Sequence, residues 1–217
     1  IFMTLSLILT LSACSSPSKE NIRGEQTLGE NELSNSDEEF ALGSTTNTVY
    51  ENKFIGIGCS FDNSWYFYTD EEIMQLNNYV ADVQGEEYEE MMKNADVVYD
   101  MFAMNDNLMD NISVNLEKTN PLSLATMNIK ESLKATIDPI KTSYDNMGYT
   151  DFKAEVTTAK IEDQEFTCLW ITTQMQDITV YQKIIPIKCN GYVANLTFTT
   201  YQEDTIDNLL SDFYIIK

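Results

Sequence analysis

The chain contains no histidine among its 217 residues. A histidine-dependent catalytic triad, a histidine general base and a histidine-ligated metal site are therefore excluded. Positive charge is also scarce, because 13 Lys and Arg residues stand against 35 Asp and Glu residues and leave a formal net charge of −22. A surface this acidic repels phosphate backbones, so we expect no nucleic-acid partner. The chain is nevertheless 43% hydrophobic, which is enough to bury a core.

Several motifs of known chemistry are missing as well. The sequence has no phosphate-binding loop, no dinucleotide-binding fingerprint and no zinc-ligand spacing, so we expect no cofactor. The acids Glu86, Glu87, Glu89 and Glu90 fit a solvated helix face. Two carboxylates could act as acid and base in sugar hydrolysis, but no feature of the sequence places two of them across a cleft. We therefore predict no catalytic residues.

Cysteine is present in only four positions. Three follow Cys14, namely Cys59, Cys168 and Cys189, and an odd number leaves at least one thiol unpaired. We expect all three to be small buried side chains. The predicted strand register does not place Cys168 opposite Cys189, but a disulfide between these two, or one that includes Cys59, stays open.

Carboxylate and amide side chains cluster around an expected turn at Asn105-Asp106-Asn107. The carboxylates are Asp100, Asp106 and Asp110, and Asn111 adds a further amide. Oxygen ligands at this density could hold calcium, although the spacing is not that of an EF-hand loop. Turn chemistry accounts for the same residues, so we predict no metal site.

The apolar stretch from Leu5 to Leu11 is too short to span a bilayer, which needs about 20 apolar residues. It fits the hydrophobic region of a secretion signal. The following Leu11-Ser12-Ala13-Cys14 resembles the bacterial lipobox. The resemblance implies that residues 1–13 are a lipoprotein signal peptide, cleaved before Cys14, and that Cys14 carries diacylglycerol and a further acyl chain such as palmitate. No basic residue precedes the apolar stretch, so we expect further residues before Ile1.

Residues 14–47 differ in composition from the rest of the chain. Between Ser15 and Asn47, two bases (Lys19 and Arg23) face seven acids: Glu20, Glu25, Glu30, Glu32, Asp37, Glu38 and Glu39. Such a segment buries too little apolar surface to offset its ordering entropy, so we expect a disordered acidic tether. As a flexible coil it would reach roughly 30 Å. We expect the lipid to hold the protein on the outer face of the bacterial cytoplasmic membrane, because an anionic leaflet repels the chain.

Residues 48–217 read as one α+β domain. Thr69 and Glu72 form a capping box that opens a helix with Ile73, Leu76 and Tyr79 or Val80 inside. Other expected helices are Glu86–Ala95, Ser123–Met147, kinked or ended at Pro139 and capped by Gly148, and Glu203–Phe213. The expected strands are Thr48–Tyr50, Phe54–Phe61, Val97–Met104, Ile112–Lys118, Phe152–Ile161, Phe166–Met175, Thr179–Lys188 and Tyr192–Tyr201.

The last four strands have two apolar faces. With turns at Gln176-Asp177 and Asn190-Gly191, one face places Phe166, Cys168 and Trp170 opposite Ile187, Ile185 and Lys183, and Ala194, Leu196 and Phe198 beside them. The other face carries Leu169, Ile171, Ile184 and Val193. A sheet that is apolar on both faces needs cover on both. We therefore predict an antiparallel sheet flanked by helices on both faces, the helices being Ser123–Met147 and Glu203–Phe213.

Asn52 to Ile57, followed by Phe61, Trp65 and the acidic helix start at Asp70–Glu72, resembles the opening of PsbP-like domains. The same order recurs in small exported lipoproteins of Gram-positive bacteria. The resemblance covers about Thr48 to Lys217 and implies an antiparallel sheet flanked by helices. The chain has Asp62-Asn63-Ser64 where the family has Pro-x-Gly before the tryptophan, and no functional residue of the photosynthetic members matches.

These observations lead to three hypotheses. The first is a non-enzymatic, lipid-anchored module outside the cytoplasm that binds a protein or envelope partner or has a structural role. The second is a receptor for a small ligand or glycan, with a binding site at a sheet edge or in an aromatic cleft built from some of the 12 tyrosines, Trp65 and Trp170. The third is a hydrolase with paired carboxylates.

Overall fold

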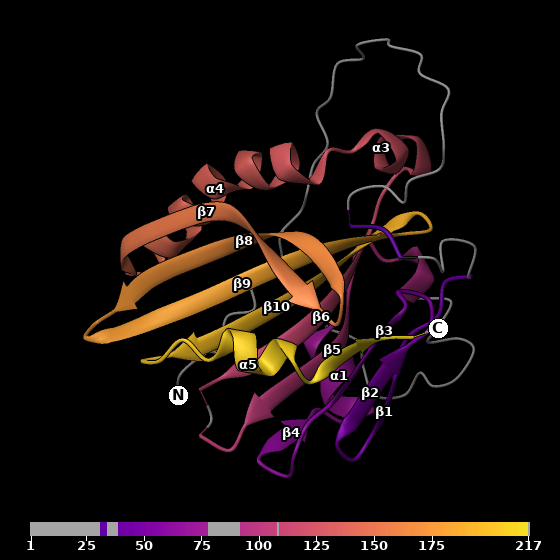
Figure 1. Ribbon diagram of the computed structural model, residues 1–217, viewed down its shortest axis with the longest axis horizontal. Helices are drawn as coiled ribbons and strands as arrows, with labels where there is room; N and C mark the ends of the chain where they lie inside the picture. Colours follow the sequence, from indigo (N-terminus) through magenta and orange to yellow (C-terminus); the bar gives the residue numbers. More distant parts are fainter. Residues whose placement is uncertain (1–30, 34–38, 78–91, 108, 217) are drawn as a thin grey trace.

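Two antiparallel sheets and a few helices make an α+β fold in the computed structural model, which describes residues 31–33, 39–77, 92–107 and 109–216 (Figure 1). The seven-stranded sheet has the order β4-β5-β6-β10-β9-β8-β7, and the four-stranded sheet has the order β1-β2-β3-β11. The strands are β1 (Ser44–Thr46), β2 (Val49–Asn52), β3 (Ile57–Ser60), β4 (Trp65–Phe67), β5 (Val97–Asn105), β6 (Asn111–Lys118), β7 (Thr150–Ile161), β8 (Gln164–Met175), β9 (Ile178–Cys189), β10 (Tyr192–Tyr201) and β11 (Phe213–Ile215). The helices are α1 (Asp70–Leu76), α3 (Pro121–Thr126), α4 (Ile129–Asn146) and α5 (Ile206–Leu210).

The four-strand meander at the end of the chain is confirmed. Its β9–β10 register pairs Ala194 with Ile187, Leu196 with Ile185 and Phe198 with Lys183, as the turn positions predict. The Asn190-Gly191 turn works because Gly191 adopts a φ of 74°, which few side chains tolerate. Strand β8 meets β9 with Trp170 opposite Lys183, also as expected, but this ladder begins only at the pair Leu169 and Ile184.

Asn31 lies between β8 and β9 beyond the pair Leu169 and Ile184, where the two strands no longer pair with each other. Its side-chain amide donates to the carbonyl oxygens of Thr167 (2.7 Å) and Pro186 (2.6 Å), and its Oδ1 accepts from the Thr167 N–H (2.7 Å). The Lys188 N–H donates to the Asn31 carbonyl at 2.9 Å, and Glu32 forms a parallel bridge with Lys188. Asn31 therefore replaces the main-chain hydrogen bonds that β8 and β9 would make with each other.

The described residues of the expected tether, 31–33 and 39–47, are part of the fold, so the expectation of disorder does not hold for them. Leu33 is buried in the core, and Phe40 and Leu42 pack against it. Strand β1 pairs with β2. These scattered apolar side chains and the long-range bonds of Asn31 offset the ordering entropy. Cys14 and the signal peptide lie outside the described residues.

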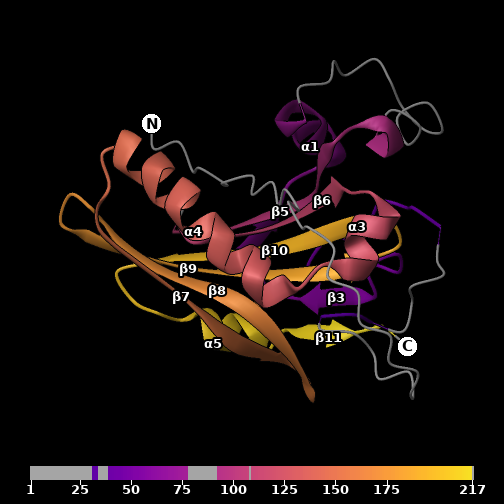
Figure 2. The ribbon, with the colours of Figure 1, turned by 90° about the horizontal axis from the view of Figure 1, so that it is seen from above.

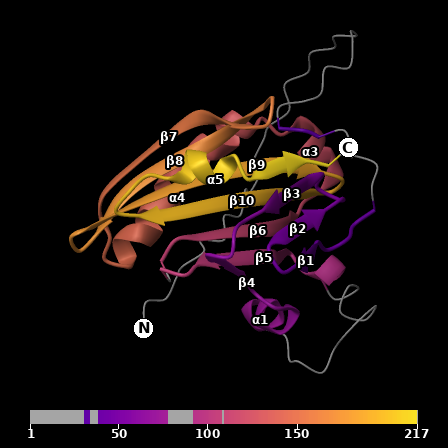
Figure 3. The ribbon, with the colours of Figure 1, turned by 60° about the horizontal axis from the view of Figure 1, so that its bottom comes forward.

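The two faces of the seven-stranded sheet have different covers (Figure 2). Leu169, Ile171, Ile184 and Val193 form a core with α3 and α4, as the alternation predicts. The opposite face packs against the four-stranded sheet and α5, which lie together on one side in Figure 3. Helix α4 thus covers one face, whereas a second sheet supplies most of the cover on the other.

The last helix is shorter than expected. Helix α5 ends at Leu210, and Phe213, the expected last residue of this helix, begins β11 instead. Strand β11 pairs with β3, with Phe213 opposite Cys59, and the Phe213 ring makes edge contacts with Phe198 and Phe61. Completing the four-stranded sheet and burying this ring outweigh one further helical turn.

The long helical stretch divides at a different place from the one expected. It forms α3 and α4, separated at Met127 and Asn128, because the Asn128 side chain caps α4 by accepting from the Glu131 N–H at 2.9 Å. Pro139 lies inside α4 and does not end it. The buried side chains Leu133, Ile140 and Tyr144 compensate for the hydrogen bond lost at the proline.

The other helix signals have mixed outcomes. Gly148 ends α4 with a φ of 84°, and the Gly148 and Tyr149 N–H groups donate back to Asp145 and Tyr144, as in a Schellman motif. The capping box of Thr69 and Glu72 is confirmed, but Met74 is the buried residue of α1.

The other expected inner residues of α1 are only partly buried (Ile73, Leu76) or lie outside the described residues (Tyr79, Val80), as does most of the expected helix Glu86–Ala95. Within the described ranges, no helix has both the length and the apolar character needed to cross a membrane.

Candidate functional site

A cleft of about 920 Å³ lies where the two sheets approach each other near β1, β4 and α1, and we call it the β1–β4 cleft. Its volume is within the range of about 300–1,000 Å³ that is usual for sites that bind organic ligands. It is lined by Leu42, Gly43, Ser44, Thr45, Asn47, Trp65, Tyr66, Phe67, Tyr68, Thr69, Asp70, Glu71, Ile73, Met74, Tyr99 and Asp100. The lining includes Trp65, one of the aromatic residues considered for a binding site, whereas Trp170 is not part of it.

Aromatic side chains from both faces of β4 line this cleft. Trp65 and Phe67 stack on Phe61 in the core, with ring centroids 5.0 and 5.7 Å from it. Tyr66 and Tyr68 alternate with them and lie 5.9 Å from each other, and Tyr66 is 50% exposed. Successive residues of a strand point to opposite faces. A cleft lined by all four must therefore run along the edge of β4.

That edge carries unpaired main-chain groups. Among the residues that the structure describes, β4 pairs only with β5. The Ser64 carbonyl accepts from Asp106 N–H (2.8 Å), and the Tyr68 N–H donates to the Phe102 carbonyl (2.9 Å), so the even-numbered residues face β5. In an antiparallel ladder, the main-chain groups of successive residues alternate between the two sides of the strand. The carbonyls of Trp65 and Phe67 and the N–H of Phe67 therefore point away from β5.

The opposite wall is held by the buried carboxylate of Asp100. Its Oδ2 accepts from the Tyr50 hydroxyl (2.5 Å) and from Asn52 Nδ2 (2.8 Å), and its Oδ1 accepts from the Gly43 N–H (2.7 Å). Burial raises the pKa of Asp100, although these donors oppose the shift. Burial and the neighbouring Asp100 carboxylate also raise the pKa of Tyr50.

Gly43 must be a glycine for this wall to form. A Cβ atom at Gly43 would lie 2.3 Å from a ring carbon of Tyr50 and 2.9 Å from Asp100 Oδ2. The network therefore ties the segment before β1 to β2 and β5 and fixes one side of the cleft.

The cleft is acidic. Asp70 and Glu71 are exposed at the start of α1, and no Lys or Arg is among the described lining residues. The Tyr66 hydroxyl donates to Glu72, whose Oε2 also accepts from the Thr69 N–H at 2.9 Å. The Tyr66 hydrogen bond is the main reason why the pKa of Glu72 is lowered, and the same bond raises the pKa of Tyr66 to about 12. These bonds join β4 to α1.

The residues considered for calcium do not converge. Asp100 is committed to the wall of the cleft, whereas Asp110 accepts from Asn107 Nδ2 (2.8 Å) and from the Tyr201 N–H (2.9 Å) at the far end of β5. The side-chain oxygens of Asn105 and Asn107 accept from main-chain N–H groups of the turn, which is ordinary turn chemistry. In the parts of the chain that the structure describes, no group of three or more acids or cysteines is placed to hold a metal ion.

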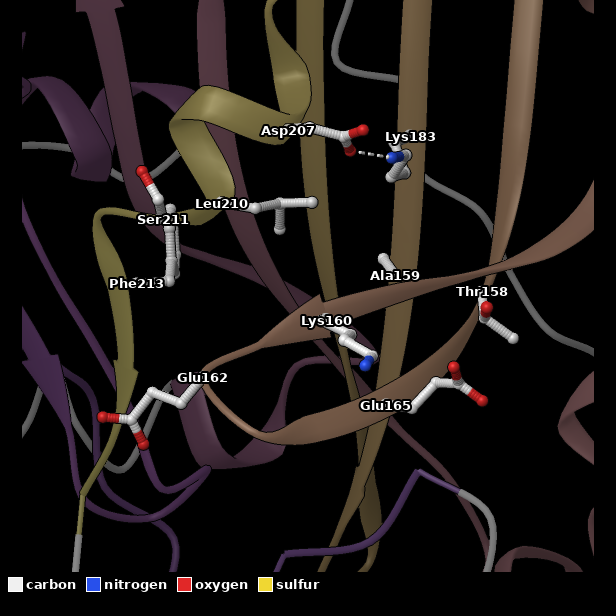
Figure 4. Close-up of a pocket in the computed structure, with 10 residues that line it drawn as sticks. All are labelled: Thr158, Ala159, Lys160, Glu162, Glu165, Lys183, Asp207, Leu210, Ser211 and Phe213. Carbon is white, nitrogen blue, oxygen red and sulfur yellow. Dashed lines mark hydrogen bonds and ion pairs between the residues drawn. The ribbon is translucent and has the colours of Figure 1, made fainter.

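A second cavity, of about 550 Å³, lies beside α5 between β7, β9 and β11 (Figure 4). Its lining mixes both signs of charge: Lys160, Lys183, Glu162, Glu165 and Asp207. Lys183 Nζ lies 2.6 Å from Asp207 Oδ1 and 5.3 Å from the centroid of the Trp170 ring, so its charge is already compensated. The sequence analysis did not predict this ion pair. Its one signal is that Lys183 stands directly before the apolar residues 184–187 of β9.

The three described cysteines, Cys59, Cys168 and Cys189, are free and buried, as expected. Burial raises the pKa of the Cys59 thiol, and it raises that of Cys168 to about 11 and that of Cys189 to about 12. A nucleophilic cysteine needs a lowered pKa, so these thiols fit the interior of the protein and not a reactive centre.

Comparison with known proteins supplies no relative: no protein-family model matches the chain, and no curated protein sequence is significantly similar to it.

Proposed function

We propose that this protein is a lipid-anchored binding module on the outer face of the bacterial cytoplasmic membrane, and that the β1–β4 cleft is its binding site. The observation that carries the proposal is the cleft itself, which combines a volume of about 920 Å³ with aromatic side chains along an unpaired strand edge. Ligand sites combine aromatic surface with polar groups that orient the ligand, and the lining of this cleft has both. Attachment through lipid at Cys14 is the second part of the proposal.

Binding is better supported than hydrolysis. A hydrolase with two carboxylates needs an acid and a base that face the substrate with their protons and lone pairs free. Asp100 is the carboxyl group with a raised pKa in this cleft, and donors from three other residues occupy its oxygens. Its role is therefore to hold the wall, and the cleft serves to bind.

The proposal extends to the fold. A PsbP-like arrangement is supported by α4 on one face of the seven-stranded sheet and by α5 on the other. The four-stranded sheet beside α5 would then be an addition of this chain to the shared sheet and helices.

The lipid part is tested by growing cells with a labelled palmitate analogue and analysing the purified protein by mass spectrometry. Label on the wild-type chain and its loss in Cys14→Ala are the expected results. A wild-type chain with an unmodified Cys14 thiol would remove the membrane anchor from the proposal.

The binding part is tested by fluorescence, because Trp65 lines the cleft and Trp170 does not. In the mature Trp170→Phe chain, kept in nonionic detergent, Trp65 is the single tryptophan reporter. We expect a saturable change in its emission with one class of ligand in a panel of basic peptides, acidic peptides and neutral oligosaccharides. A Tyr66→Ala substitution should weaken that response. No saturable change with any class contradicts the assignment of the cleft.

A further inference from the structure

We propose that the occupant of the β1–β4 cleft is an extended, basic peptide segment of another protein, which adds as a strand to the free edge of β4. This inference rests on the proposed function, since it names the class of ligand for the same cleft. It combines three properties of the cleft: an available strand edge, side-chain surfaces on both sides of that edge, and negative charge without a compensating base.

The edge geometry favours an extended ligand. Trp65 and Phe67 present main-chain carbonyls, and Phe67 presents an N–H, on the side of β4 away from β5. A peptide that pairs with these groups obtains main-chain hydrogen bonds, as in other cases of strand addition. Its alternate side chains then point to opposite sides of β4. The cleft offers the half-buried Trp65 on one side and the exposed Tyr66 with the half-buried Tyr68 on the other, whereas the Phe67 ring is buried in the core.

Charge selects among extended peptides. Asp70 and Glu71 are exposed lining residues of the cleft, and the described lining has no Lys or Arg to neutralise them. The whole chain adds to their field with its formal charge of −22. Lysine and arginine side chains also interact favourably with the faces of tryptophan and tyrosine rings. A basic segment is thus attracted from a distance and held by the rings on contact.

The same charges argue against an occupant from this chain. Between Ser15 and Asn47, seven acids stand against two bases, so the protein's own N-terminal segment is repelled from the cleft. A second copy carries the same net charge and meets the same repulsion. The partner is therefore a different protein with an exposed basic strand or tail.

The test uses fluorescently labelled octapeptides and the mature lipoprotein in nonionic detergent, with binding followed by anisotropy at 50 mM salt. The probe is (Lys-Val)₄, and the controls are (Glu-Val)₄ and (Ser-Val)₄. We expect (Lys-Val)₄ to bind at least about tenfold more tightly than either control peptide. Raising the salt to 500 mM should weaken its binding, because the Debye length shrinks to a few ångströms.

Two further comparisons separate a specific site from general attraction to an acidic protein. The cleft variant Asp70→Asn/Glu71→Gln is matched with Asp163→Asn/Asp177→Asn, which removes two exposed carboxylates from turns elsewhere. We expect about a tenfold loss of affinity in the cleft variant and less than about a twofold loss in the matched control. Equal losses in both variants would overturn the inference.

Strand addition is tested with (Lys-Val)₄ methylated at every main-chain nitrogen, which keeps the charges and removes the N–H donors. We expect this peptide to bind at least about tenfold more weakly. Unchanged binding overturns strand addition. If Trp65 responds to a neutral oligosaccharide and not to (Lys-Val)₄, the inference fails while the binding function stands. If nothing binds, both fail.

Discussion

The two end strands of the seven-stranded sheet differ in length, composition and surroundings. Strand β7 has 12 residues, and its exposed side chains include Lys153, Glu155 and Lys160. Strand β4 has three residues, all aromatic, and lies in a cleft. Charged side chains on a long edge prevent the pairing of two sheets from different molecules. The chain thus protects β7 with charge, whereas β4 is short, uncharged and enclosed on one side by β1.

The difference between β7 and β4 concerns how each edge is kept from pairing with other molecules. An edge that is both apolar and unpaired is a risk for aggregation unless access to it is restricted. At β4 the restriction comes from β1, α1 and the Asp100 network, which line the cleft beside this strand. Under the proposal made above, the cleft admits one extended basic segment. Charged side chains thus protect the edge of β7 from pairing with other sheets, whereas β4 keeps an aromatic edge. Under the proposal made above, that edge selects a basic segment.

We expect the largest effect on stability from Gly43→Ala, which adds a methyl group in the wall of the β1–β4 cleft. The new methyl group meets the Tyr50 ring at 2.3 Å, and we expect a loss of about 3 kcal/mol in the free energy of unfolding. Urea denaturation measures it, with Gly148→Ala as the control. Nothing lies within 4 Å of a Cβ at Gly148, so only its positive φ costs about 1 kcal/mol. Equal losses would show that the close approach at Gly43 is not limiting.

Asn31→Ala tests the other end of the sheet, where β8 leaves β9. The substitution removes the hydrogen bonds that the Asn31 side chain makes with the Thr167 N–H and the Pro186 carbonyl, and we expect a loss of about 2 kcal/mol in the free energy of unfolding. Thermal or urea unfolding measures it. The control is Asn63→Ala, an exposed position in the turn before β4, with an expected change below about 0.5 kcal/mol. A negligible change at Asn31 would mean that residues 31–33 are not integral to the fold.

Removing the charges from β7 should change association more than stability. We expect Lys153→Thr/Glu155→Thr/Lys160→Thr to alter the free energy of unfolding by less than about 1 kcal/mol and to produce dimers or larger species. Sedimentation velocity at several protein concentrations measures this. A variant that stays as monodisperse as the wild type would remove the contrast between β7 and β4.

The smallest effect concerns the link between β4 and α1. The pKa of Glu72 is held below its ordinary value of 4.5, chiefly by the Tyr66 hydroxyl. A lowered carboxyl pKa stabilises the fold above the ordinary pKa, and this contribution is lost as the pH falls through the folded-state pKa. In Tyr66→Phe, NMR titration should show the pKa of Glu72 moving up towards its ordinary value. A titration that matches the wild type would mean that the hydroxyl is not the cause.

Local signals were the ones that sequence analysis could interpret. The capping box at Thr69, the end of α4 at Gly148 and the turn at Asn190-Gly191 each depend on a few neighbouring residues, and all three are confirmed. The capping role of Asn128 was missed because the helical periodicity continues on both sides of it. Asn31 was missed because its partner Thr167 is 136 residues away, and no local pattern records that distance.

For the candidate site, the sequence indicated only the kind of surface, an aromatic one, and not its location or its other lining residues. Aromatic residues around Trp65 indicate surface for a ligand, but the same residues could have filled the core, as the inward stacking of Trp65 on Phe61 partly does. From the sequence, Asp100 belongs to a cluster around a hairpin turn. It is part of the cleft because Tyr50 and Asn52 of β2 and Gly43, just before β1, all donate hydrogen bonds to it. Such convergence depends on how the sheets pack.

By itself, the sequence determined the acidity, the absence of histidine chemistry and the alternation that gives the last four strands two apolar faces. Each of these follows from residue identity or from a period of two along a strand. The tertiary structure alone decided which surfaces cover those faces, that Phe213 joins a sheet and that β4 is the end strand of the seven-stranded sheet in the described part of the chain. The reason is that pairing between distant segments is set by the packing free energy of the whole molecule, which no single stretch of sequence contains.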